Sequence, residues 1–160
     1  MRIGIMSDSH DNLPLVARAV DVFNRQSVGL VLHAGDFISG FTASVFKDLN
    51  CRLVGVYGNN DGDRLYLKRR FEDIGDLYDD YREMDVEGKR LVLMHQPKFI
   101  ELLAARSAYD LIVYGHTHEI DIRQGPPLVV NPGECGGWTT GTATVVIVDL
   151  DSMSAELLTL

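Results

Sequence analysis

The chain has 160 residues, of which 46% are hydrophobic and 24% are charged. These values are typical of one globular domain, and we treat residues 1–160 as that domain. The formal net charge of −8 argues against non-specific binding to nucleic acids or anionic membranes, because both attract basic surfaces. The negative charge does not exclude a phosphate substrate, because bound metal ions make the local electrostatic potential positive.

Cysteine content and hydropathy bear on the cellular compartment. The two cysteines, Cys51 and Cys135, are far apart in the sequence, which argues against a disulfide framework or a cysteine-rich zinc site. No apolar stretch approaches the ~20 residues that a membrane span needs. The first residues enter a strand pattern rather than a signal peptide. We therefore expect a cytoplasmic protein with reduced thiols and no membrane partner.

The first half of the chain alternates short apolar runs with helical patterns. The runs predict buried strands at residues 2–6, 30–32 and 52–56. Helices are predicted at residues 13–23, 41–49 and 64–74. Asp11 or Asn12 can cap the first of these helices. This order is typical of a parallel sheet with helical crossovers.

The second half of the chain is mostly β. A tight hairpin is predicted around Glu87-Gly88, with strands at residues 81–86 and 89–94. A short helix at 99–106 precedes strands at residues 111–114, 120–123, 128–130, 142–150 and 155–160. We therefore predict an α/β fold. Two mixed sheets pack face to face with helices outside, which gives a four-layer α-β-β-α sandwich.

Five of the predicted strands run into side chains that bind divalent cations. The candidate metal ligands are Asp8, His10, Asp36, Asn59, His95, His116 and His118. In open α/β sheets, sites form at the carboxyl ends of the strands, so these side chains are expected to meet. Oxygen and imidazole donors without thiolate suit Mn²⁺, Fe²⁺, Zn²⁺, Ni²⁺ or Co²⁺ better than Ca²⁺ or Mg²⁺. Seven ligands suit two metals that share a bridging carboxylate, which is the usual apparatus of phosphoester hydrolysis.

Each candidate also has an ordinary structural interpretation. Asn59 beside Gly58 suits a turn, and His95 suits a hydrogen-bonded strand end. His33 lies within a strand, and a buried structural role is favoured for it. For the other candidates, the ordinary roles would have to coincide at the ends of five strands. A metal site is therefore the preferred interpretation.

The ordered motifs resemble those of a known family. Asp8-Ser9-His10, Gly35-Asp36, Gly58-Asn59-Asn60-Asp61, His95 and Gly115-His116-Thr117-His118 resemble the motif set of the calcineurin-like metallophosphoesterases. The short chain is similar to the small prokaryotic phosphodiesterase branch. The resemblance implies that one metal is held by Asp8, His10, Asp36 and His118, and the other by Asp36, Asn59, His95 and His116. It also implies that Asp36 bridges the metals together with a hydroxide that attacks phosphorus, and that residues 131–133 support the site from behind.

One position departs from the family pattern. Many relatives carry histidine after the metal-binding asparagine, where it contacts the phosphate and protonates the leaving group, but this chain has Asn60. Asparagine donates hydrogen bonds but is not a general acid, and general acid catalysis is worth about 10²–10⁴-fold. We predict Asp36, Asn59 and Asn60 as the residues at the reaction centre. We expect modest activity that favours diesters with good leaving groups.

The resulting prediction is a phosphodiesterase with two divalent transition metals, Mn²⁺ before Ni²⁺, Zn²⁺, Fe²⁺ or Co²⁺, and a small-molecule phosphodiester substrate. The alternative is an interaction scaffold, since a eukaryotic retromer subunit resembles this fold and serves chiefly as a platform. Competent side chains at all seven ligand positions argue against the scaffold. A phosphoesterase for nucleotides, phospholipid head groups or protein phosphates stays open. A nuclease is disfavoured, because the chain lacks a basic track. A homodimer is expected only because such symmetry is common. Phe37, Phe41 and Trp138 are candidates for its face, and core or site-wall roles are at least as well supported for them.

Overall fold

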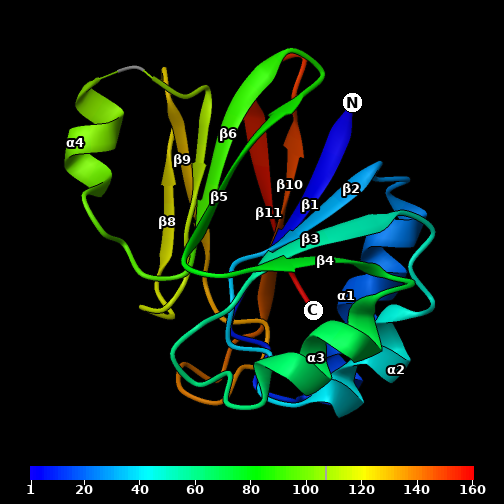
Figure 1. The fold of residues 1–160 in the computed structure, drawn as a ribbon. Coiled ribbons are helices and arrows are strands. Elements are labelled where there is room, and N and C mark those ends of the chain that lie inside the picture. Colours follow the sequence, from blue (N-terminus) through cyan, green and yellow to red (C-terminus); the bar gives the residue numbers. More distant parts are fainter. Residues whose placement is uncertain (107) are drawn as a thin grey trace.

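The computed structural model describes residues 1–106 and 108–160, and it contains two β-sheets that pack face to face. In chain order the elements are β1 (Arg2–Met6), α1 (Leu13–Arg25), β2 (Leu30–His33), a 3₁₀ helix (Gly40–Thr42), α2 (Ala43–Phe46), β3 (Arg52–Val56), α3 (Arg64–Phe71), β4 (Gly75–Tyr78), β5 (Tyr81–Val86), β6 (Lys89–Met94), α4 (Ile100–Ala105), β7 (Leu111–Val113), β8 (Ile120–Arg123), β9 (Leu128–Pro132), β10 (Thr144–Asp149) and β11 (Ser154–Thr159). Figure 1 shows the layers from left to right as α4, one sheet, the other sheet, and the group α1 to α3. The predicted four-layer α/β sandwich is confirmed.

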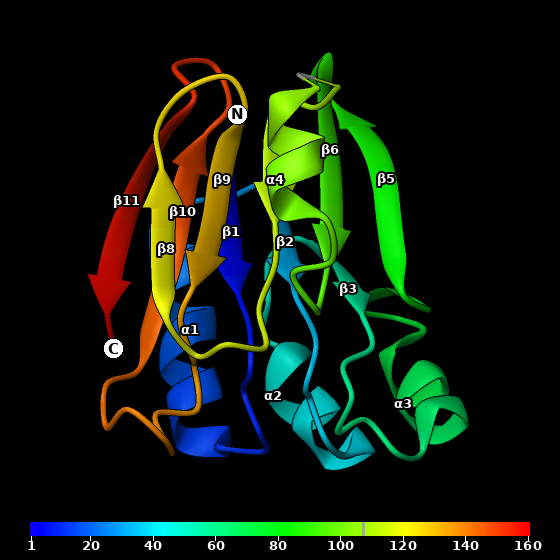
Figure 2. The same ribbon diagram turned by 90° about the vertical axis from the view of Figure 1, so that its left-hand side faces the viewer.

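Strand order explains how the sheets bring the motifs together. The six-stranded sheet has the order β11-β10-β1-β2-β3-β4, and its strands β1 to β4 are parallel. The five-stranded sheet, which faces the viewer in Figure 2, has the order β5-β6-β7-β9-β8 with parallel β6, β7 and β9 at its centre. Parallel neighbours place their carboxyl ends at one edge. The strands that precede the motifs therefore deliver them to the same edge within each sheet.

Apolar side chains fill the three spaces between the layers. Between the sheets, fully buried residues include Ile5, Leu32, Leu93, Val113 and Val146. The helices α1 to α3 pack on the six-stranded sheet through Phe23, Phe46 and Phe71, among others. On the outer face of the five-stranded sheet, Ile100 packs with Met94 and Val129. Strands buried on both faces read as continuous apolar runs, which is why their positions were predictable.

The helices fit the sequence predictions less closely than the strands. The predicted helix 41–49 is a 3₁₀ turn followed by the four-residue α2. The predicted helix 64–74 ends at Phe71, and β4, which was not predicted, follows it. β4 is a short edge strand with alternating burial, so its sequence carries little strand signal before it pairs with β3. None of the helices in the described ranges has the length and apolar character to cross a membrane.

One further prediction near the first helix is wrong. Neither Asp11 nor Asn12 caps α1 through its side chain; the Asn12 amide instead donates to the carbonyl of Gly136 at 2.7 Å. Here the tertiary contact wins over the local preference. Phe37 has the core role that was the alternative to a partner face, because it is fully buried and stacks on His33 with ring centroids 3.6 Å apart. His33 has the buried structural position that was favoured for it.

Candidate metal centre

The predicted ligands occupy the segments that follow five strands. β1, β2 and β3 of one sheet lead to Asp8, His10, Asp36 and Asn59. β6 and β7 of the other sheet lead to His95, His116 and His118. The site therefore lies where the two sheets meet at the carboxyl ends of their parallel strands, and neither sheet could form it alone.

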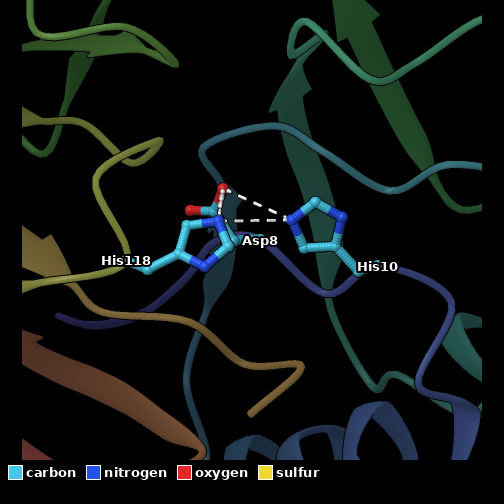
Figure 3. Close-up of side chains that lie close together, drawn as sticks. All are labelled: Asp8, His10 and His118. Carbon is cyan, nitrogen blue, oxygen red and sulfur yellow. Dashed lines mark hydrogen bonds and ion pairs between the residues drawn. The ribbon is translucent and has the colours of Figure 1, made fainter. Parts of the chain in front are cut away.

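One group of donor atoms contains Asp8, His10 and His118 (Figure 3). The Nε2 atom of His118 lies 3.4 Å from Asp8 Oδ1 and 3.4 Å from His10 Nε2. The distance from His10 Nε2 to Asp8 Oδ1 is 3.9 Å. These three atoms converge on one point from two loops that are 108 residues apart in the sequence, and together they could hold one cation.

A second group contains Asp8, Asp36 and His95. His95 Nε2 lies 3.5 Å from Asp36 Oδ2 and 2.8 Å from Asn59 Oδ1. The other ring nitrogen of His95, Nδ1, lies 2.7 Å from the carbonyl oxygen of Ala34. Because a carbonyl only accepts, this hydrogen bond places the proton on Nδ1 and leaves the Nε2 lone pair facing the site, as metal-binding histidines require.

Asp36 lies between the two histidine groups. Its Oδ2 atom is 3.7 Å from His10 Nε2 and 3.5 Å from His95 Nε2. Asn60 covers this carboxylate, since its backbone N–H and its side-chain amide donate to Oδ1 and Oδ2 at 2.9 and 2.7 Å. Among the predicted aspartate and histidine ligands, His116 is the one whose side chain belongs to neither of these two donor groups. Its exposed ring packs against His95, with 5.1 Å between the ring centroids.

The donors fit a bound metal. Asp8 is fully buried, and its Oδ1 is one of two buried side-chain polar atoms without a hydrogen-bond partner in the described part of the chain. Burial raises the pKa of the Asp8 carboxyl group. A buried carboxylate oxygen without a donor is costly unless a cation satisfies it. Carboxylates, imidazoles and an amide without thiolate suit divalent transition metals.

The backbone at the site is strained. Five predicted ligands have positive φ angles: Asp8 (50°), His10 (43°), Asp36 (59°), His116 (71°) and His118 (61°). Such conformations cost of order 1–3 kcal/mol each and cluster at functional sites. Neighbouring glycines permit the close packing, because a Cβ on Gly58 would lie 2.0 Å from Asp36 Oδ1 and one on Gly115 would lie 1.9 Å from Ser7 Oγ. These close contacts explain why Gly58 and Gly115 are glycines in their motifs.

Two buried acids at the site were not predicted. Asp61 accepts hydrogen bonds from the backbone N–H groups of Asp36, Gly58 and Ile38 at 3.1, 2.7 and 2.7 Å. It thereby ties the segment after β2 to the segment after β3. Asp61 stands in the motif that contains Asn59, and this position is the signal that could have identified it.

Glu134 has the corresponding role on the other side of the site. Its carboxylate accepts from the backbone N–H groups of Trp138, Thr139 and Thr140, and it lies 3.2 Å from His118 Nδ1. Burial alone would raise the pKa of Glu134, but these hydrogen bonds hold the pKa below its ordinary value. The carboxylate therefore stays charged beside His118. No spacing in the sequence signals this contact.

The segment predicted to support the site from behind does contact a ligand loop. Asn131, in β9, donates from its side-chain amide to the carbonyl of Gly115 at 3.2 Å and to Thr117 Oγ1 at 2.9 Å. Its own Oδ1 accepts from Gly133 N–H at 3.0 Å. Asn131 thereby fixes the loop that carries both His116 and His118.

Comparison with known proteins identifies the family. Residues 1–153 match the calcineurin-like phosphoesterase superfamily domain. The chain belongs to this superfamily. A phosphodiesterase of Methanocaldococcus jannaschii is 39% identical over 156 residues, 94% of each chain. The structure of an archaeal phosphodiesterase, at 37% identity, superposes with a TM-score of 0.94 over all of both chains.

Two more distant proteins also resemble this chain. Phosphodiesterase YfcE of Escherichia coli is 27% identical over 148 residues, which are 83% of this chain and 78% of YfcE. Vps29 of Chaetomium thermophilum, at 13% identity, has a TM-score of 0.72 over 100% of this chain and 94% of Vps29, and that likeness concerns the fold alone. The resemblance found in the sequence is confirmed, and the chain is a phosphoester hydrolase of a family that uses divalent metals.

Proposed function

We propose that this chain is a two-metal phosphodiesterase for small diesters. One observation carries the proposal: two groups of donor atoms share the buried Asp8, whose Oδ1 atom has no hydrogen-bond partner among the described residues. Asp36, between His10 and His95, is placed to serve both groups. A pair of adjacent sites is the arrangement that phosphoester hydrolysis uses.

The proposed ligand sets are those of the family pattern. One metal would be held by Asp8, His10, Asp36 and His118, and the other by Asp36, Asn59, His95 and His116. His116 would have to turn from its present packing against His95 to take part. When bound, two such ions supply a nucleophilic water at neutral pH and neutralise charge on the phosphoryl oxygens. Mn²⁺ is our first choice of metal, and Ni²⁺, Zn²⁺, Fe²⁺ or Co²⁺ are alternatives.

Asn60 governs which diesters the enzyme hydrolyses. Its exposed side chain reaches the Asp36 carboxylate, so it is positioned to donate a hydrogen bond to a phosphoryl oxygen at the same place. It cannot transfer a proton to a departing alkoxide. Substrates whose leaving groups are stable without a proton, such as aryl oxides, should therefore react best. A cytoplasmic location and a homodimer stay predictions.

The test is metal-dependent turnover. Metal-stripped protein is reconstituted with Mn²⁺ and assayed on bis(4-nitrophenyl) phosphate, with calorimetry to count bound ions. We expect turnover that Asp36→Asn lowers by more than the about 10–100-fold typical of residues that only support a ligand. Asp21→Asn is the matched control, because Asp21 is an exposed residue of α1 whose carboxylate pairs with Arg25 in the same helix.

The result also discriminates between the enzyme and the scaffold. Two bound ions without turnover for Mn²⁺, Ni²⁺, Co²⁺ or Zn²⁺ would contradict the proposal and favour an interaction protein that keeps the fold. One bound ion with full turnover would contradict the two-metal arrangement but leave the phosphodiesterase intact.

A further inference from the structure

A cavity of about 600 Å³ adjoins the candidate metal centre. Asn59 and His95, two of the predicted ligands, form part of its wall. Its volume is in the range of about 300–1,000 Å³ that is usual for small-molecule sites. A diester with its phosphate at the metal centre would therefore extend one of its two ester groups into this cavity.

The cavity is lined by both buried apolar and exposed aromatic side chains. Val92 and Met94 of β6 line it and are buried. Tyr81 and Phe99 line the cavity although their side chains are 61% and 74% exposed. Phe99 also has a φ of 61°, a conformation that costs free energy in a residue other than glycine. Exposed aromatic rings contribute little to the core, so their place beside the metal centre points to a ligand.

One aromatic wall is held rigidly. The hydroxyl of Tyr109 donates to Glu83 Oε1 at 2.8 Å, and Arg90 donates to the other oxygen of Glu83 at 3.0 Å. The Arg90 guanidinium also lies over the Tyr109 ring, 5.2 Å from its centroid. This bracing fixes the Tyr109 ring as a flat wall of the cavity. A pre-positioned aromatic face stacks on a ligand ring at little entropic cost.

The charges around the cavity argue against a second phosphate. Arg64 and Lys98 line it, but so do Asp80 and Glu83. The Arg64 guanidinium is already engaged by Asp79 and by the carbonyl of Gly58. A polyphosphate or a nucleic acid strand needs a consistently basic track. A group with apolar faces and a polar edge fits this combination of aromatic walls and mixed charges.

We propose that this cavity binds a planar aromatic group of the substrate, and that the substrate class is a nucleoside phosphodiester whose base stacks on the exposed rings that line it. The inference rests on the proposed phosphodiesterase function. An aliphatic or sugar group would gain less, because it lacks the planar π-face with which a base stacks on Tyr81 and Phe99.

Binding of phosphate monoesters tests the proposal without requiring turnover. Adenosine 5′-monophosphate, ribose 5-phosphate and octyl phosphate carry the same phosphate on a base, a sugar and an alkyl chain. Their dissociation constants are measured by calorimetry on Mn²⁺-loaded protein. We expect the adenosine ester to bind about tenfold more tightly than ribose 5-phosphate, the scale of stacking one base on aromatic side chains.

Two variants and a control locate the effect. Tyr81→Ala and Phe99→Ala should each reduce this preference several-fold, and the double variant should abolish it. Phe41→Ala is the matched control, because Phe41 is 68% exposed but lies outside the cavity wall. All three positions are exposed, so the folded state should persist, and thermal unfolding of each variant checks this.

The outcomes separate this inference from the proposed function. Equal binding of the adenosine and ribose esters, or a preference that survives in the double variant, would overturn the aromatic site. Tightest binding of octyl phosphate would replace it with an alkyl site. Base-dependent binding by a protein that hydrolyses no diester would support the cavity assignment and refute the phosphodiesterase.

Discussion

On the buried side of the metal centre, Asp36 and Asp61 accept backbone hydrogen bonds from the segments around them, and Glu134 does the same for the loop at 138–140. On the exposed side, Asn59 contacts His95, and His116 packs on the same ring. We call the buried residues Asp8, Asp36, Asp61 and Glu134 the floor, and the exposed residues Asn59, Asn60 and His116 the rim.

This difference in hydrogen bonding suggests that floor and rim residues have different roles. Floor residues are fixed by several hydrogen bonds each, so changing one should disturb the ligand geometry, the metal affinity and the fold together. Rim residues have few partners in the fold, so changing one should alter the reaction and leave stability almost unchanged. The predictions below test this division, from the largest expected effect to the smallest.

Asn60→His should have the largest effect, and on the reaction alone. A histidine beside the phosphate can protonate a leaving alkoxide, which is worth about 10²–10⁴-fold. We expect kcat/KM to rise towards the lower end of that range for a diester with an alkyl leaving group. For bis(4-nitrophenyl) phosphate it should change little, because nitrophenolate leaves without a proton. Steady-state kinetics on the two substrates measure the difference.

Asn60→Ala is the control for the histidine variant. It removes the amide that donates to Asp36 without adding an acid. If the alanine and histidine variants change alkyl diester hydrolysis equally, loss of the contact explains the effect and a missing general acid does not.

Asp61→Asn should damage both metal binding and stability. Asparagine offers one acceptor oxygen, and its amide group would face N–H donors that Asp61 now accepts from. We expect the free energy of unfolding to fall by about 1–3 kcal/mol, the cost of unsatisfied buried groups. Metal affinity should fall about 10–100-fold. Urea unfolding of the metal-free protein and calorimetric titration with Mn²⁺ measure the two effects.

Asp63→Asn is the matched control for this variant. Asp63 is exposed and caps α3 by accepting from Tyr66 N–H at 3.0 Å, a role that asparagine fills equally well. Unchanged stability in both variants would mean that the floor is not braced as described.

Glu134→Gln should weaken metal binding less than Asp61→Asn does, and it should also lower stability. Both carboxylate oxygens of Glu134 accept from loop N–H groups, so the glutamine amide would face N–H donors, and the charge 3.2 Å from His118 Nδ1 is lost. We expect Mn²⁺ affinity to fall about tenfold, because the carboxylate no longer orients His118. Glu119→Gln, on the exposed surface next to His118 in sequence, is the control. Equal affinity in the two variants would show that Glu134 serves the loop alone.

Most of the fold could be predicted from the sequence, because the buried strands are continuous apolar runs. The strands β1, β2, β3, β6 and β7 lie where these runs predict them. It could not reveal β4, whose four residues become a strand only by pairing with β3. At the site, motif order indicated the ligands, and the structure places Asp8, His10, Asp36, Asn59, His95 and His118 together. The role of Glu134 could not be predicted from the sequence, because it depends on how the loop after β9 folds back onto His118.

His33 should give the smallest effect at neutral pH, because its contribution is a pH dependence of stability that develops below pH 6.5. It is fully buried, its Nδ1 accepts from Gly35 N–H at 3.1 Å, and its Nε2 lies 3.0 Å from Ser9 Oγ. Burial lowers its pKa well below the ordinary value of 6.5. Below pH 6.5 the unfolded chain therefore binds a proton that the folded chain excludes. Stability should fall as the pH decreases below 6.5, by at most about 1.4 kcal/mol per pH unit, and recover above it.

His33→Gln tests this sign, because glutamine has a donor and an acceptor but does not titrate. Urea unfolding of the metal-free proteins from pH 5.0 to 7.5 gives the free energy of unfolding for each. The variant also loses the stacking on Phe37, which should lower its free energy of unfolding by the same amount at every pH. Titration of the other histidines is common to both proteins and cancels in their difference. The wild type should therefore lose stability faster than the variant as the pH falls below 6.5, and parallel curves would mean that His33 is protonated in the folded protein.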